Sequence, residues 1–236
     1  MLILLLLQAT AQGVAERDLF DLTEALAGSW NNTEAVYFAG ELGDEPPPHM
    51  SLHVHADNDG TINLSNGQRW TLVARDGGLQ AEARQGLHQC SFRVDRTGDV
   101  FFLAPLESGC PMFATENPTI MVTAREMAWP GVGTLYPADI YSCWVSRQRP
   151  DGSWTFDADI ELSEGTYHQM DAIPGLPPVG IKLRHVRWPY GRNRDSQVLY
   201  IHETEDEPAV SYVWGEPDAP RLAVNLRWVQ VSCTRN

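Results

Sequence analysis

The chain has 236 residues, of which 43% are hydrophobic, and a formal net charge of −14. This length fits one larger β domain or two small domains, and the hydrophobic share is sufficient for a buried core. The negative charge argues against nucleic acid and anionic membrane surfaces as partners, because binding to phosphate groups requires a basic surface.

The first eleven residues predict a signal peptide. Residues 2–7 form a short apolar run, and Ala9, Thr10 and Ala11 supply the small side chains that a cleavage site needs. The run is far shorter than the ~20 residues of a membrane-spanning helix. We therefore expect a periplasmic or secreted protein that is not an integral membrane protein. The alternative is an apolar N-terminus that stays in the mature chain.

Residues 16–26 show the clearest helical periodicity in the sequence. Leu19, Leu22 and Leu26 recur at a spacing near 3.6 residues, which predicts an amphipathic helix. Gly28 follows as a suitable residue for the helix end.

After residue 30 the sequence is typical of strands separated by polar turns. In "SLHVHA" (51–56), Leu52 and Val54 alternate with Ser51, His53 and His55, so the two sets lie on opposite faces of a strand. About a dozen such segments follow one another, which indicates an antiparallel β sandwich or barrel. No interdomain linker interrupts them, so we expect residues 12–236 to form a single β-barrel domain.

The four cysteines are consistent with export. Cys90, Cys110, Cys143 and Cys233 form an even set, as is usual for disulfide-bonded proteins of oxidising compartments. None belongs to a C-x-x-C pair, so a zinc ribbon or thioredoxin-type site has no support. The sequence permits three pairings. Four buried free thiols in a cytosolic protein are the alternative.

The histidines of "HMSLHVHADNDG" (49–60) are the most distinctive candidates for chemistry. His53 and His55 lie two residues apart on one strand face, a geometry that zinc and iron sites use. A third ligand is needed, and His168 and His202 are candidates without positional support. A metal-dependent enzyme built on His53 and His55 is therefore one hypothesis. A solvent-exposed strand face is the simpler interpretation.

Two further patterns have alternative interpretations. Residues 182–194 are rich in Lys and Arg and 202–208 carry four acidic side chains, which indicates either an anion-binding patch or two strands whose exposed faces attract each other. The eight tryptophans either line a cavity for a flat apolar ligand or pack in the core.

The N-terminal order of helix, Gly28-Ser29-Trp30 and strands resembles calycin-type barrels. A more specific likeness is to the CpcT/CpeT family of phycobiliprotein chromophore lyases. It rests on "LAGSWNNTEAVYF" (26–38), on "GCPMF" (109–113) and on "YSCWVSRQRPDGSWTFDADIELSEGTYHQMD", which ends at Asp171. The resemblance covers roughly residues 19–171. It implies an all-β, antiparallel calycin/lipocalin-like barrel with a short N-terminal helix.

The resemblance also implies disulfide pairings and a ligand. By the order of the family's cysteines, it makes Cys110–Cys143 and Cys90–Cys233 the expected disulfides. Together with the predicted export, it implies a barrel that holds a small apolar or tetrapyrrole-like ligand such as a bilin, with no required cofactor, and that presents this ligand to an acceptor protein. Lyase activity is implied by the resemblance alone. Within this barrel, strand alternation makes His53, His55, Trp70, Arg93 and Tyr141 the expected ligand contacts.

A third hypothesis is a binding or structural module of the cell envelope without catalysis. It requires only the fold and export, since many unrelated functions share each of the common β architectures.

Overall fold

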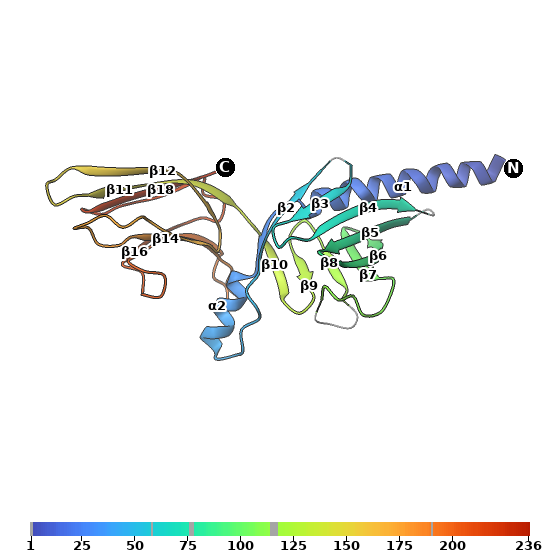
Figure 1. The fold of residues 1–236 in the computed structure, drawn as a ribbon, viewed down its shortest axis with the longest axis horizontal. Coiled ribbons are helices and arrows are strands. Elements are labelled where there is room, and N and C mark those ends of the chain that lie inside the picture. Colours follow the sequence, from blue (N-terminus) through green and yellow to red (C-terminus); the bar gives the residue numbers. More distant parts are fainter. Residues whose placement is uncertain (1, 58, 76–77, 114–117, 190) are drawn as a thin grey trace. The chain divides into compact units, whose positions relative to one another are not determined.

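The computed structural model describes the chain except for residues 1, 58, 76–77, 114–117 and 190. The chain forms two compact units, Met1–Pro137 and Ala138–Asn236. The first contains a closed β-barrel and the second contains two four-stranded sheets (Figure 1). The expectation of one barrel domain over residues 12–236 is therefore corrected. The barrel closes where β1 (Gly28–Asn31) meets β10 (Gly133–Ala138), so later strands find no free edge to join.

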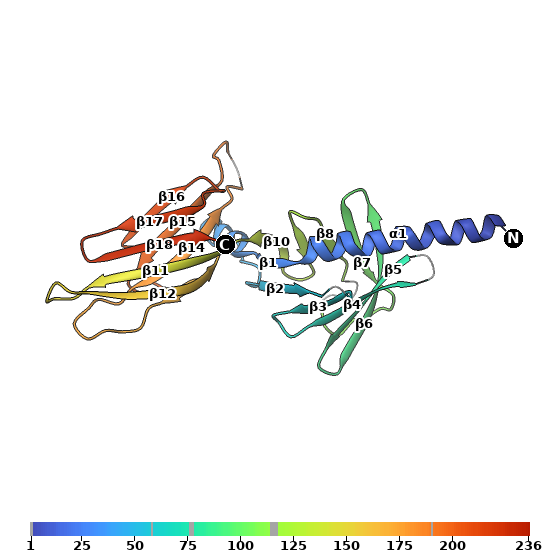
Figure 2. The ribbon, with the colours of Figure 1, turned by 90° about the horizontal axis from the view of Figure 1, so that it is seen from above.

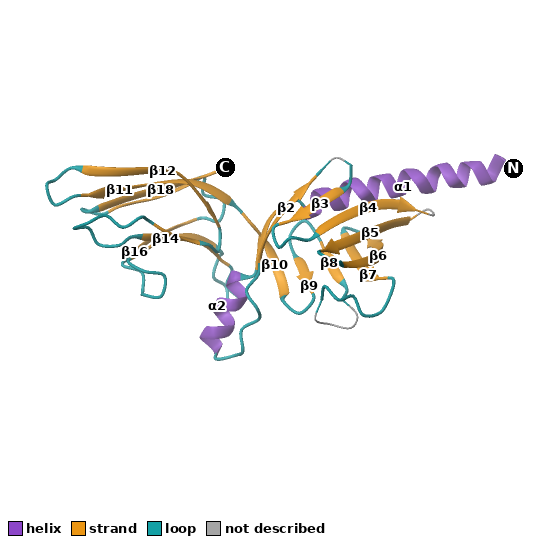
Figure 3. Cartoon of the chain, viewed as in Figure 1, coloured by secondary structure: helices purple, strands orange, loops and turns teal. Residues whose placement is uncertain are grey.

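The predicted all-β class with an antiparallel barrel and an N-terminal helix is confirmed. Strands dominate the chain, as the orange arrows of Figure 3 show. Around the barrel the order is β1-β10-β9-β8-β7-β6-β5-β4-β3-β2, so neighbours in sequence are neighbours in the sheet. The barrel strands between β1 and β10 are β2 (Ser51–Ala56), β3 (Thr61–Leu64), β4 (Arg69–Arg75), β5 (Gly78–Gln85), β6 (His88–Thr97), β7 (Val100–Pro105), β8 (Ile120–Val122) and β9 (Met127–Trp129).

The N-terminal helix α1 (Leu2–Leu26) contains the predicted segment 16–26 and packs on the barrel. Leu22 is fully buried and Leu26 is 6% exposed, so one face of the helix joins the barrel core. Arg96 of β6 anchors the helix from outside the core, because its Nη1 donates to Asp18 Oδ1 at 2.7 Å and to Asp21 Oδ2 at 2.6 Å. The helix is thus held to the barrel by both apolar and ionic contacts.

A second helix, α2 (Thr33–Leu42), corrects the expectation that everything after Trp30 forms strands. Its sequence, TEAVYFAGEL, is rich in good helix formers, and these outweigh the local β-branched residues. Gly43 ends the helix in the left-handed region at φ 75°, and its N–H bonds back to the helix. The helix separates β1 from β2 in sequence, while β1 and β2 still pair directly.

The second unit is a pair of antiparallel sheets that share one apolar core. Buried side chains of both sheets form one cluster, which identifies the unit as a β sandwich. The strand order is β12-β11-β18-β17 in one sheet and β13-β14-β15-β16 in the other (Figure 2). The strands are β11 (Ile140–Gln148), β12 (Trp154–Ser163), β13 (Tyr167–Gln169), β14 (Gly180–Val186), β15 (Ser196–His202), β16 (Ser211–Gly215), β17 (Arg221–Asn225) and β18 (Val229–Arg235).

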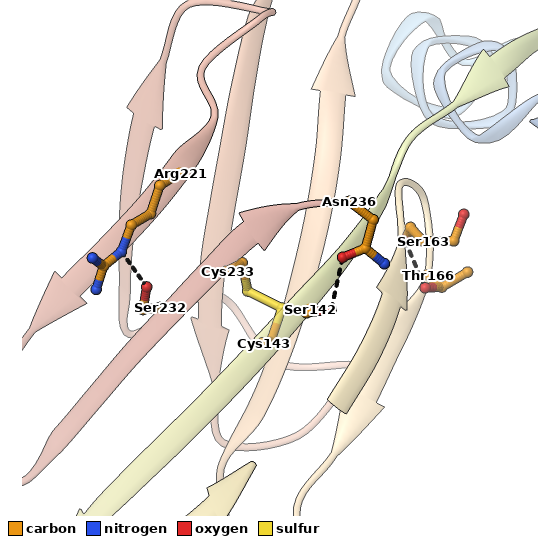
Figure 4. Close-up of a disulfide and its surroundings, with 8 residues drawn as sticks. All are labelled: Ser142, Cys143, Ser163, Thr166, Arg221, Ser232, Cys233 and Asn236. Carbon is orange, nitrogen blue, oxygen red and sulfur yellow. Dashed lines mark hydrogen bonds between the residues drawn. A yellow bond between two sulfur atoms is a disulfide. The ribbon is translucent and has the colours of Figure 1, made fainter. Parts of the chain in front are cut away.

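The disulfides join Cys90 to Cys110 and Cys143 to Cys233. The expected pairs Cys110–Cys143 and Cys90–Cys233 are therefore wrong. Each bridge lies within one unit, since Cys143 and Cys233 face each other across β11 and β18, with Cα atoms 4.0 Å apart (Figure 4). Cys90 of β6 instead holds the loop after β7 against the barrel.

The two bridges indicate an oxidising, extracytoplasmic environment, where disulfides form and persist. Among the described residues, no helix combines the length and apolar composition that crossing a membrane requires.

Removal of the disulfides should destabilise each unit separately. The Cys143–Cys233 bridge spans 90 residues and the Cys90–Cys110 bridge spans 20. Loop-closure entropy therefore predicts a loss of about 4.6 kcal/mol for Cys143→Ser with Cys233→Ser, and about 3 kcal/mol for the other serine pair. Urea denaturation followed by far-UV circular dichroism measures both losses. Peptide mapping without reductant checks the pairing, and a peptide containing Cys110 linked to Cys143 would contradict it.

Candidate functional site

The histidine pair of β2 lies on the outside of the barrel. Leu52 and Val54 are 1% and 3% exposed and belong to the barrel core, whereas His53 and His55 are exposed. The predicted alternation of the strand is therefore confirmed, and both imidazoles face away from the interior.

Each of these histidines has a partner close to it on the outer surface. His53 Nδ1 forms a hydrogen bond with Ser29 Oγ at 2.9 Å, and His55 Nε2 lies 3.2 Å from Asp57 Oδ1. Within the described part of the chain, no group of three or more His, Cys, Asp or Glu side chains is placed to hold a metal ion. The pair thus lacks the third protein ligand that a zinc or iron site requires.

We expect the purified protein to contain no stoichiometric zinc or iron. Elemental analysis of the intact chain, beside a variant with His53→Ala and His55→Ala, measures this directly. One equivalent of metal in the parent that disappears in the variant would restore the metal-site hypothesis.

Trp70 lies inside the barrel, in a cluster of aromatic rings. It stacks on Phe92 with ring centroids 5.5 Å apart and contacts Trp129 at 6.1 Å. Phe113, from the loop that Cys110 holds, packs against Phe92 and Trp129 at 6.0 and 5.6 Å. These rings fill the interior with side chains of the protein itself.

The cavity left between these rings and the surrounding aliphatic side chains has a volume of about 10 Å³. Such a space holds about one water molecule at most. A tetrapyrrole in this interior would therefore require the barrel to open. The lining residues are Leu26, Val54, Ile62, Leu64, Trp70, Leu103, Ile120, Met127 and Trp129.

Arg93 and Tyr141 are not among the residues that line this cavity. Arg93 lies on the outer face of β6, and its Nε donates to Asp95 Oδ2 at 2.7 Å. Tyr141 belongs to the second unit, in the core of the sandwich. Of the expected ligand contacts, Trp70 alone lies inside the barrel, and His53, His55 and Arg93 lie on its outer face.

Tyr141 is a buried phenol with an unusual titration. Its ring is fully buried, and among the described residues its hydroxyl has no hydrogen-bond partner. Burial, followed by repulsion from the carboxylate of Glu164, raises the pKa of Tyr141 from 10.0 to about 12. The neutral phenol is therefore the form that the folded sandwich prefers.

This pKa shift predicts how stability depends on pH. Because the pKa of Tyr141 is higher in the folded than in the unfolded state, its contribution is complete below about pH 10 and is lost as the pH rises through about 12. Tyr141→Phe should remove this part of the pH dependence and, since it also removes a hydroxyl without a partner, should not lower stability at pH 7. Urea midpoints of both proteins between pH 8 and 12 measure this. Parallel curves at all pH values would contradict the shift.

The outer face of sheet β13-β14-β15-β16 carries a group of aromatic side chains, of which only His202 was a candidate from the sequence, as a metal ligand. Tyr212, Tyr200, His202 and Tyr167 form a continuous series in which each ring centroid lies 6.0 Å from the next. We call these four residues the aromatic row. Trp214 is close to it on β16 and is 67% exposed.

Only part of the aromatic row could be found from the sequence. The alternation in "SQVLYIH" (196–202) places Tyr200 and His202 on one strand face, and "SYVWG" (211–215) does the same for Tyr212 and Trp214. The pairing that puts Tyr200 opposite Tyr212 depends on the register between strands, which alternation alone does not give.

The outer face of the other sheet also carries exposed aromatic residues. Phe156 of β12 is 67% exposed, and its ring lies 5.8 Å from that of Trp144 on β11. Both sheets of the sandwich thus present large rings on their outer faces.

No protein-family model, curated protein or solved structure matches this chain. The likeness to the CpcT/CpeT family therefore stays a prediction that rests on the quoted sequence segments.

Proposed function

We propose that this chain is a non-catalytic binding protein of the periplasm or the extracellular space. In this proposal both β units serve as rigid scaffolds, and recognition takes place on the outer faces of the sandwich. It corresponds to the cell-envelope binding module among the hypotheses above.

The observation that supports this proposal most strongly is the contrast between interior and surface. The cavity beside Trp70 and Trp129, as the described residues line it, has a volume of about 10 Å³ and is too small for an organic ligand. Tyr212, Phe156 and Trp214 are meanwhile 62, 67 and 67% exposed. Aromatic side chains are preferred contacts in binding surfaces because they bring a large rigid area at a low cost in conformational entropy.

The compartment follows from the disulfides and the N-terminal sequence. Both bridges favour an oxidising environment, and the apolar residues 2–7 followed by Ala9 and Ala11 favour export. A protein in this position meets cell-envelope polymers and extracellular material as its candidate ligands.

The tetrapyrrole carrier and the lyase activity stay predictions of the family resemblance. Neither the small cavity beside Trp70 nor the outward positions of His53 and Arg93 favour them. The metal-dependent enzyme lacks a third ligand among the described residues. The binding module needs none of these features.

Co-sedimentation with cell-envelope fragments tests the proposed function. Isolated, washed envelope material from the cells that make the protein should pellet the purified chain saturably. A variant with Phe156→Ala, Tyr212→Ala and Trp214→Ala should pellet at least tenfold less well, because it loses the most exposed rings of both sheets.

The matched control for this experiment carries His53→Ala and His55→Ala, which change exposed side chains of the barrel. It should pellet like the parent protein. A parent chain that stays in the supernatant, or a triple variant that pellets as well as the parent, would contradict the proposed function.

A further inference from the structure

The aromatic row crosses the outer face of one sheet from its edge strand β16 to the opposite edge strand β13. Tyr212 lies opposite Tyr200, Tyr200 opposite Lys182, and Lys182 opposite Tyr167. Tyr212, Tyr200, Lys182 and Tyr167 therefore lie on one line across the sheet, at right angles to the strands. Strand alternation sends their neighbours, such as Leu199 and Ile201, into the sandwich core.

Gly180 makes the row continuous. A Cβ atom at this position would overlap with the hydroxyl oxygen and ring of Tyr167, so the tyrosine ring occupies the space that a side chain would fill. His202 lies directly opposite Gly180 on β15. The ring of Tyr167 therefore extends across the glycine and reaches His202 at 6.0 Å.

Hydrogen bonds hold two of the rings in place. The hydroxyl of Tyr167 donates to Gln169 Oε1, and Gln169 Nε2 donates to the carbonyl of Val179 at 2.8 Å. His202 Nδ1 lies 2.9 Å from the carbonyl oxygen of Glu207, which fixes the imidazole. A surface whose side chains are ordered before binding loses less entropy when a ligand arrives.

The charges around the aromatic row are of both signs. Lys182 lies on the line of the row, and the guanidinium of Arg184 lies over the ring of Tyr200 at 5.9 Å. Glu205 and Asp206 lie close to the ring of Tyr167. Burial and, after it, the negative charge of these two carboxylates raise the pKa of Tyr167. The face thus offers hydrogen-bond donors and acceptors, and its electrostatic potential is not of a single sign.

These features select one class of ligand among those that stack on aromatic rings. A single-stranded nucleic acid requires a positively charged groove, which this mixed face on a chain of net charge −14 does not supply. A neutral sugar chain requires aromatic rings that its C–H groups can contact. It also requires hydrogen-bond donors and acceptors for its hydroxyl groups. Tyr212, Tyr200 and His202 are tilted by 41° and 42° from one ring to the next, and Tyr167 meets His202 edge-on at 77°. The series therefore offers both ring faces and ring edges to a ligand that is itself a chain of rings.

We propose that the aromatic row, with Trp214 beside it, is a binding site for a neutral polysaccharide chain. This inference rests on the proposed function, since it names the ligand class of one of the two outer faces. Lys182 and Gln169 would contact hydroxyl groups along the chain, while the exposed rings of Tyr212 and Trp214 would carry most of the stacking.

Affinity gel electrophoresis of the full chain tests this site. Native gels contain hydroxyethyl cellulose, xylan, galactomannan or laminarin as neutral probes, and alginate or heparin as anionic ones. We expect at least one neutral polysaccharide to retard the chain and neither anionic polymer to do so. Tyr212→Ala with Trp214→Ala should weaken the retardation about tenfold or more, whereas Tyr212→Phe should preserve it, because the phenyl ring still stacks.

Two further variants separate the site from general surface effects. Phe156→Ala removes an equally exposed ring from the other sheet and should leave the retardation unchanged. Gly180→Ala keeps every ring but displaces that of Tyr167, so it should weaken the retardation. Circular dichroism and native mobility without polysaccharide verify that each variant is folded, and the surface pair Tyr212→Ala and Trp214→Ala tests the site even if Gly180→Ala does not fold.

Several results would overturn this inference. The inference is wrong if no neutral probe retards the chain, or if only the anionic polymers do. It is also wrong if the variant with Tyr212→Ala and Trp214→Ala is retarded as strongly as the parent, or if Phe156→Ala weakens the retardation. Envelope binding that depends on the exposed rings, without retardation by the neutral probes, would leave the proposed function in place and would assign the face to another ligand, such as a peptide. Failure of both experiments would remove both proposals.

Discussion

Alternation of side chains along antiparallel strands is the constraint on which the rest of this structure depends. Successive residues of a strand point to opposite faces of the sheet. When an apolar side chain lies in the interior, the next residue along the strand therefore lies on the outer face. In β2 this places Leu52 and Val54 in the barrel core and the histidines outside. In β15 it places Leu199 and Ile201 inside and the rings of Tyr200 and His202 outside. The packed interior and the exposed rings of the proposed binding face are thus two results of one pattern.

The two units apply this pattern with different outcomes. In the barrel, the rings of Trp70, Phe92 and Trp129 point inward and fill the space that a hollow barrel would offer to a ligand. In the sandwich, the core consists mostly of aliphatic side chains together with Tyr141, and several of the largest rings remain on the outer faces. The disulfides are confined within the units, where each restrains one scaffold. The proposed recognition on the outer faces would use such scaffolds, because a binding site is most precise when rigid elements hold its side chains.

The features that could be predicted from the sequence are those that depend on local pattern. The spacing of Leu19, Leu22 and Leu26 located the end of α1, and the alternation of residues 51–56 gave the strand and its buried face. Cysteine pairing and the division into two units depend on long-range register, because they are set by which strand closes the barrel and which strand lies beside β11. Sequence distance carries little information on either. The contact between Tyr167 and His202 across Gly180 is of the same kind, since three strands must be aligned before it exists.

Hydroxyl-radical footprinting tests most directly the claim that recognition takes place on the outer rings while the barrel interior is closed. In the free protein, the account predicts rapid oxidation of Tyr212, Trp214 and Phe156 and slow oxidation of the barrel tryptophans Trp70 and Trp129, which are 2% and 5% exposed. Addition of an envelope polysaccharide should protect Tyr212 and Trp214 and leave the other residues unchanged. Rapid oxidation of Trp70 and Trp129 in the free protein, followed by their protection when ligand is added, would contradict the account and place the ligand inside the barrel.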